Sequence, residues 1–417
     1  LAGAGRLPAG SDDIEGPSPT EPACAGGTSG VSLHVLPFRP VAGRPLRMIA
    51  VSRRPLDLPS VGLTGPSGSP DARLVDSWGP GPFAWEFVSE PSEPGEHVAV
   101  LRSRVGRHAC VRVDVASEAA ADRVGPSSGV WPIERAWDGA LEDLYSAWVA
   151  RLFRVPPDFA GGWRRLSSVL RSRDGNVLHD ALGWSEDSPR AADAGGAPVV
   201  RARADCGDMP YALRAYFSWK FRLPFRFRRC DRSDPWAGVE CHAEHTNLTA
   251  GHDDVADPVE RFSRFLEVDV AWSVHSATGR TLAEDDDADF YPVELSREAL
   301  RPGTVFVYPH GHLLVVAGWL EEADGGIVPA AVDGHPDGTV TFKRFSERFF
   351  PYLPGTRTAG FKAFRPVEFD GRVVRPVGND ALASSPAPAP FSGEQYRFSR
   401  PSEFHEAIRS MAAAPGS

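Results

Sequence analysis

A cysteine at the start of a predicted helix and a histidine at the start of a predicted strand constrain this chain most. The first segment reads Asp205-Cys206-Gly207 before an apolar helical run, and the second reads Gly311-His312 before the apolar run 313–316. A helix N-terminus favours negative charge, because its free N–H groups and its dipole stabilise a thiolate there. A neighbouring histidine can then serve as general base and acid. The two segments therefore predict a thiol nucleophile at Cys206 with His312 as its partner.

Residues near His312 leave alternatives open for the base and for a third group. His310 competes with His312, because alternation along a strand places both on the same side. We prefer His312 because it directly precedes the apolar run. A third side chain should orient the imidazole from the next predicted strand, where Asp333 is the first choice and His335 the second.

The five cysteines predict two disulfides and one free thiol. We expect Cys24 to pair with Cys110 and Cys230 with Cys241, which leaves Cys206 reduced, as a nucleophile must be. Parity alone leaves the other connectivities open. Disulfides form in oxidising compartments, so we expect a periplasmic or secreted location.

A second constellation in this chain has the residue types of a zinc site. Cys230, Cys241, His242 and His245 could provide tetrahedral ligands. Their spacing fits no well-known zinc module, and Cys230 with Cys241 is already a plausible disulfide. We therefore predict no metal and no other cofactor.

Composition and charge argue against nucleic acid as a partner and against a membrane span. Hydrophobic residues make up 42% and charged residues 24% of the 417, which is typical of a globular protein. The formal net charge of −10 argues against nucleic acid as a partner. We find no window of about 18 apolar residues, so we expect no membrane span. The oligomeric state stays open.

Changes in composition divide the chain into four predicted parts. Residues 1–30 are rich in Gly, Pro, Ala and Ser and predict a flexible leader. Residues 31–117 contain short alternating apolar runs between Pro/Gly/Ser turns, which predict a small all-β sandwich. Residues 118–370 carry the candidate site. Residues 371–417 contain Ser-Pro-Ala repeats and one amphipathic stretch, and we expect a flexible C-terminal tail.

Two stretches resemble known families. The run Pro94-Gly95-Glu96-His97-Val98-Ala99-Val100-Leu101, leading to a strand that ends at Val115, resembles bacterial immunoglobulin-like modules. The Asp205-Cys206-Gly207 start, Leu223-Pro224, Pro302-Gly303-Thr304-Val305-Phe306-Val307 and Gly311-His312-Leu313-Leu314-Val315-Val316 resemble NlpC/P60 peptidases. The order of cysteine, histidine and a later polar residue is shared with transglutaminase-like proteins.

The resemblance implies an α+β, papain-like catalytic domain preceded by the immunoglobulin-like sandwich. The gap between Cys206 and His312 then implies an insertion at 225–300. It also implies a Cys-His-Asp amide hydrolase that works through a thioester on peptidoglycan stem peptides or other peptides. Two alternatives remain: a transglutaminase-like acyl transferase, and a catalytically inactive adhesion or scaffold protein.

Overall fold

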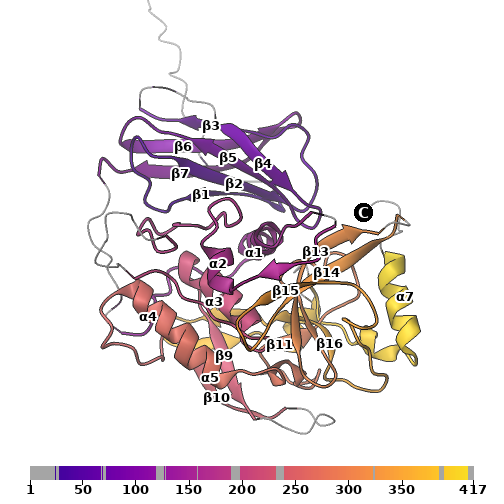
Figure 1. The fold of residues 1–417 in the computed structure, drawn as a ribbon. Helices are drawn as coiled ribbons and strands as arrows, with labels where there is room; N and C mark the ends of the chain where they lie inside the picture. The colour runs from indigo at the N-terminus through magenta and orange to yellow at the C-terminus, as the bar shows by residue number, and fades with distance from the viewer. Residues whose placement is uncertain are drawn as a thin grey trace, which may run out of the picture.

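The computed structural model describes most of the chain beyond its N-terminal segment. The described residues are Cys24, 28–66, Gly68, 72–118, Pro126, 128–156, 158–188, 198–231, 239–322, 325–384 and 389–411. The predicted leader, 1–30, therefore lies almost entirely outside them. The described part is a mixed α/β structure, in agreement with the coarse fold class expected from the sequence (Figure 1). Within it, no helix has the length and apolar character needed to cross a membrane.

The first seven strands form two antiparallel sheets. They are β1 (Val31–Leu36), β2 (Leu46–Ser52), β3 (Ser60–Thr64), β4 (Arg73–Trp78), β5 (Phe83–Ser89), β6 (Gly95–Ser103) and β7 (Gly106–Val115). One sheet has the order β1-β2-β5-β4 and the other β3-β6-β7. Met48 and Ala50 of β2 pack with Leu63 and Leu101 of the opposite sheet in one core. We call these seven strands the sandwich.

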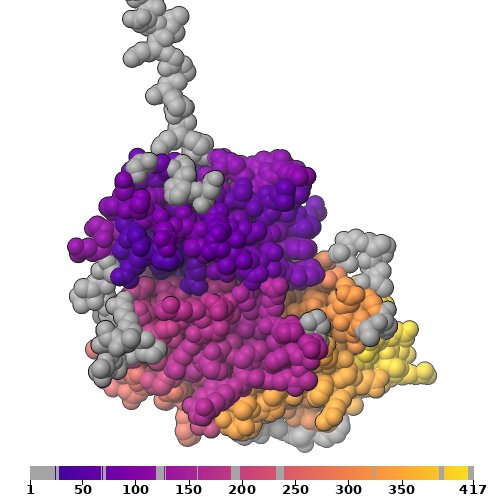
Figure 2. All heavy atoms as spheres, turned by 45° about the horizontal axis from the view of Figure 1, so that its top comes forward, coloured from indigo at the N-terminus to yellow at the C-terminus, as the bar shows by residue number. Residues whose placement is uncertain are grey.

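One outer face of the sandwich is also buried. Ile49 and Val51 point away from the sandwich core and join a second hydrophobic cluster, which includes Trp148 of α1 (Gly139–Leu152). The Trp78 indole N–H donates to the carbonyl of Ala147 over 2.8 Å. The sandwich thus rests on the remainder of the molecule through apolar contacts, and Figure 2 shows its indigo atoms against the magenta residues below.

The candidate site lies on a seven-stranded antiparallel sheet. Its strands in spatial order are β11 (Phe290–Pro292), β16 (Gly360–Phe364), β12 (Val305–Val307), β13 (Leu313–Glu321), β14 (Ile327–Gly334), β15 (Val340–Arg344) and β8 (Gly162–Trp163). Side chains alternate between its faces. Val305 and Val307 pack with α1, α2 (Leu166–Leu170) and α3 (Met209–Phe221), whereas Phe306 packs in a separate core on the other face.

The region 225–300, expected as an insertion, contains more regular structure than the sequence pattern predicts: the pattern indicates a helix at 259–265 but not the strands before it. A hairpin of β9 (Arg226–Cys230) and β10 (Cys241–Thr246) is closed by the Cys230–Cys241 disulfide. It is followed by α4 (Pro258–Arg264), the π-helix η1 (Phe265–Val270), α5 (Ala271–Ser273) and the 3-10 helix η2 (Thr278–Arg280).

The expectation of a flexible tail over 371–417 is wrong for most of that range. β17 (Val367–Phe369) pairs with β18 (Val374–Pro376), and α6 (Asn379–Ser384), the 3-10 helix η3 (Glu394–Arg397) and α7 (Pro401–Met411) follow. Phe404 and Ile408 of α7 are fully buried in the core on the outer face of the seven-stranded sheet. That face is apolar and needs a cover, and the amphipathic α7 supplies part of it (Figure 1). Residues 385–388 and 412–417 of the predicted tail lie outside the described residues.

Candidate active site

Cys206 lies in the turn that leads into α3. The Asp205 side chain shapes this turn: its Oδ1 accepts hydrogen bonds from the backbone N–H groups of Gly207 (2.7 Å) and Asp208 (3.3 Å). The Asp205 carbonyl accepts from the N–H of Met209 over 3.1 Å. Cys206 is partly exposed and carries a free thiol. The thiol is thus accessible at the N-terminal side of a helix, where negative charge is favoured.

Two glycines let other backbone segments approach this turn closely. A Cβ at Gly207 would clash with the backbone of His275, and a Cβ at Gly334 would lie 2.5 Å from the Asp205 carbonyl oxygen. Only a residue without a side chain fits such an approach. The Cys206 turn is therefore held between the segment at His275 and the end of β14.

His312 ends the short connection between β12 and β13. The connection is closed by the Tyr308 N–H, which donates to the His312 carbonyl over 2.9 Å, and by the Gly311 N–H, which donates to the Tyr308 carbonyl over 3.1 Å. The Tyr308 ring lies edge-on to the imidazole with centroids 4.9 Å apart. These contacts fix the ring, and its Nε2 lies 2.9 Å from Oδ2 of Asp333. The Cys206 side chain lies close enough to the imidazole to raise the pKa of His312. Because Nε2 is engaged by Asp333, Nδ1 is the ring nitrogen that is not used in that contact.

Asp333 is a buried carboxylate on β14, with only 2% of its surface exposed. The register pairs it with Thr341 of β15, whose hydroxyl donates to Oδ1. Lys343 Nζ lies 3.6 Å from Oδ2, and His335 Nε2 lies 3.4 Å from Oδ1. The carboxylate is therefore surrounded by donors that stabilise its charge.

The electrostatics of the site favour an imidazolium on His312. Burial alone would lower the pKa of His312, but its hydrogen bonds to Asp333 and Cys206 outweigh that effect and raise the pKa to about 9. Burial would likewise raise the pKa of Asp333, yet the hydrogen bonds from His312 and Thr341 hold that pKa below its usual value. A cation next to a cysteine sulfur favours the thiolate. The imidazolium of His312 and the carboxylate of Asp333 thus form a charged pair beside the Cys206 sulfur.

Asp208 is a site feature that sequence reasoning missed. It is buried, and burial followed by the nearby charge of Asp205 raises the pKa of Asp208 to about 8. This carboxyl is therefore largely protonated at neutral pH, two residues after the cysteine. The signal was present in the run Asp205-Cys206-Gly207-Asp208, which places two carboxyls at the same helix start.

The structure separates the alternative site residues. His310 is exposed at the tip of the β12–β13 connection, because the chain turns there and the strand alternation does not extend to it. His335 contacts Asp333 and donates to or accepts from the Thr341 hydroxyl over 3.0 Å. It therefore lies on the far side of Asp333 and does not replace it as the partner of His312.

The cysteines pair as expected: Cys24 with Cys110 and Cys230 with Cys241, with Cys206 free. Cys230 and Cys241 are joined in a disulfide, so they cannot provide the thiolate ligands of the zinc site considered above. His242 instead lies 2.8 Å from Asp231.

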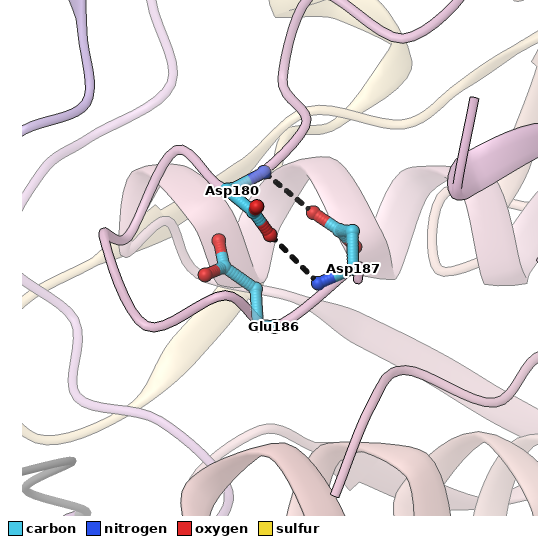
Figure 3. Close-up of side chains that lie close together, drawn as sticks. All are labelled: Asp180, Glu186 and Asp187. Atoms are coloured by element: carbon cyan, nitrogen blue, oxygen red, sulfur yellow. Dashed lines mark hydrogen bonds between the residues drawn. The ribbon is translucent and has the colours of Figure 1, made fainter. Parts of the chain in front are cut away.

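A buried acidic cluster lies apart from these residues in the chain. Asp180 and Asp187 exchange hydrogen bonds between backbone N–H groups and carboxylates, with Glu186 beside them (Figure 3). Their oxygens are close enough together to hold a metal ion. The fully buried Lys220 ammonium, however, contacts Glu186 and lies 2.6 Å from Asp187. The Lys220 ammonium thus supplies the positive charge that would otherwise come from a metal ion. We therefore interpret the cluster as a structural ion-pair network.

Comparison with known protein families and curated proteins finds no match for this chain. No protein-family model matches the chain, and no curated protein is significantly similar to it.

Proposed function

We propose that this protein is a cysteine-dependent hydrolase of amide bonds. The single observation that carries the proposal is the connected set Cys206, His312 and Asp333, in which a buried carboxylate supports an imidazolium beside an accessible thiol. A nucleophile, a base and an orienting group within hydrogen-bond reach are the recurring signature of covalent acyl transfer.

The reaction follows from these positions. The Cys206 thiolate attacks the amide carbonyl carbon, and a C–S bond forms as the carbonyl oxygen takes up negative charge. The His312 imidazolium gives its proton to the amide nitrogen, the C–N bond breaks, and the amine leaves. His312 then accepts a proton from water, whose oxygen attacks the thioester. The C–S bond breaks, a carboxylic acid is released and the thiolate returns.

The fold supports the same class. A cysteine at the start of α3 faces an antiparallel sheet that carries the histidine and the aspartate, which is the arrangement expected of a papain-like core. The sandwich, which we propose to be immunoglobulin-like, would hold the enzyme near its substrate. Two disulfides are consistent with a secreted protein. From the NlpC/P60 resemblance, we propose peptidoglycan stem peptides as the substrate and the cell envelope as the location.

A second candidate is transglutaminase-like acyl transfer. It is favoured by the orienting residue, because Asp333 rather than His335 holds the imidazole, and the transglutaminase-like proteins use Asp at that position. In this reaction an amine, rather than water, attacks the thioester.

The test combines labelling with turnover. Iodoacetamide at mildly acidic pH, followed by peptide mapping, should modify Cys206 rapidly in the wild type and slowly in His312→Ala. Purified peptidoglycan and a peptide library should yield new fragments with the wild type and none with Cys206→Ala. A primary amine is then added to the reaction. If the enzyme is a hydrolase, the product should remain a free acid; if it is a transferase, the amine should be incorporated into the product. If Cys206 resists alkylation and the protein cleaves no substrate, the result would favour the alternative of a catalytically inactive adhesion or scaffold protein.

A further inference from the structure

We propose that a groove between the sandwich and the turn before β12 binds an organic dianion, through arginines contributed by both sides. This site involves none of the residues of the Cys206–His312–Asp333 set. Its ligand would carry carboxylate or phosphate groups together with an apolar portion.

The groove has the size of a small-molecule site. Its volume is about 650 Å³, within the range of roughly 300–1,000 Å³ that is typical of ligand pockets. One wall is formed by the loop after β2 and the connection between β4 and β5, and the other by Arg297, Glu298 and Arg301. Residues that are far apart in sequence therefore line one concave surface at the junction of the two parts of the molecule.

The floor of the groove is an ion-pair network around one buried carboxylate. Asp143 of α1, which is 3% exposed, lies 2.8 Å from Arg53 Nε and 2.6 Å from Arg301 Nη1. One carboxylate is thus shared by two guanidinium groups. The three side chains of this network come from three separate segments of the chain. The ion pairs hold Arg53 and Arg301 in place, so these two arginines are pre-positioned for a ligand.

Two further arginines line the groove without forming an ion pair in the described part of the chain. Arg54 and Arg297 line the groove, and among the residues that the structure describes no ion pair engages either guanidinium. Four arginines therefore face the two carboxylates of Asp143 and Glu298, an excess of two positive charges. This excess is the reverse of the chain as a whole, whose formal net charge is −10. A localised basic groove on an acidic protein attracts an anion of matching charge.

The chemistry of the walls narrows the class of ligand. Guanidinium groups bind carboxylate and phosphate oxygens in bidentate pairs. Pro80, Pro82 and Phe83 add an apolar surface, and the Phe83 ring is stacked on Trp85 with centroids 6.4 Å apart. A ligand with two negative charges and an apolar or ring-shaped portion would satisfy both parts of the groove.

The test is calorimetric titration of the full chain at low ionic strength with two probes, phenyl phosphate and phthalate. Both are aromatic dianions, and they distinguish phosphate from carboxylate recognition. Saturable binding of at least one probe is expected, and Arg54→Gln and Arg297→Gln should each weaken it about tenfold, since hydrogen bonds to charged groups have that order of energy. Arg372→Gln removes the same charge from an exposed turn outside the groove and should leave binding unchanged.

Each result decides the proposal. Tight binding of only one probe supports the site and identifies the acidic group that it recognises. Failure of both probes to saturate would overturn it, as would a double Arg54→Gln/Arg297→Gln variant that melts like the wild type and still binds normally. An equal loss in Arg372→Gln would also overturn it, because the effect would then reflect net charge alone. Binding in the Cys206→Ala variant should equal that of the wild type, which separates this site from the proposed hydrolase.

Discussion

At the scale of single residues, the pKa of His312 decides how the proposed enzyme depends on pH. That pKa is raised to about 9, so the imidazolium that protonates the leaving amine persists through neutral pH and is lost as pH rises through this value. We therefore expect kcat/KM for amide hydrolysis to fall above about pH 9. Asp333→Asn removes a charge that stabilises the imidazolium, so the alkaline limb should move to lower pH and the rate should drop. A pH–rate profile of both proteins measures this, and identical limbs would contradict it.

The two neighbouring histidines provide a matched pair of variants. We expect His312→Ala to reduce hydrolysis by a factor of about 10²–10⁴, the usual contribution of a general acid–base group. His310→Ala should change it less than about twofold, because His310 is exposed at the tip of the connection. Steady-state rates on the same peptide substrate measure both, and combining His312→Ala with Cys206→Ala should add no further loss. A larger effect of His310→Ala would reassign the base.

At the scale of elements, the end of β14 positions the cysteine turn. In Gly334→Ala the new Cβ would lie 2.5 Å from the Asp205 carbonyl oxygen. The backbone before Cys206 must then move, and we expect hydrolysis to fall at least about tenfold, since small displacements of reacting groups cost rate steeply. Gly318→Ala in β13 is the control, because its Cβ meets nothing within 4 Å. Rates and alkylation of Cys206 should be compared in both, and an unchanged Gly334→Ala would refute this role.

Helix α7 is a structural element rather than a tail. Phe404→Ala removes a fully buried ring, and we expect the free energy of unfolding to fall by about 3–5 kcal/mol. Glu406→Ala, on the exposed side of the same helix, should change it by less than about 0.5 kcal/mol. Urea unfolding followed by circular dichroism measures both. Equal stability of the two variants would instead support the expectation that this segment is a flexible tail.

At the scale of the whole molecule, β2 lies between two cores. Met48 faces the core inside the sandwich, whereas Ile49 faces the cluster that contains α1. In the full chain, Met48→Lys and Ile49→Lys should each destabilise by several kcal/mol, because an unpaired charge is buried. In a fragment ending near residue 120, only Met48→Lys should do so, while Ile49→Lys should improve solubility by removing an exposed apolar residue.

Thermal melts and size-exclusion chromatography of the fragment and of the full chain separate these cases. A fragment that is unfolded without any substitution would show that the sandwich depends on α1. That result would show that residues 31–117, although they form a sandwich, do not fold independently.

Much of this protein is determined by local sequence. The turns and alternating runs of 31–117 predict strands where β1, β2, β5, β6 and β7 are found, because side-chain alternation is a local property of a half-buried strand. They do not predict β3 and β4. The odd number of cysteines and the helix start at Cys206 identify the free thiol, since parity and capping need no tertiary information. The apolar run after His312 likewise predicts β13.

Other features were decided only by the tertiary structure. The choice of His312 over His310 depends on a turn that places one ring against Tyr308 and leaves the other exposed. The choice of Asp333 over His335 depends on the register between β14 and β15, which pairs Asp333 with Thr341. The burial of α7 depends on an apolar sheet face formed by strands distant in sequence. The burial of α7 is set by contacts between segments far apart in the chain, whereas the two site choices are set by the geometry of a turn and by the register of neighbouring strands. None of these leaves a periodic signal in one segment alone.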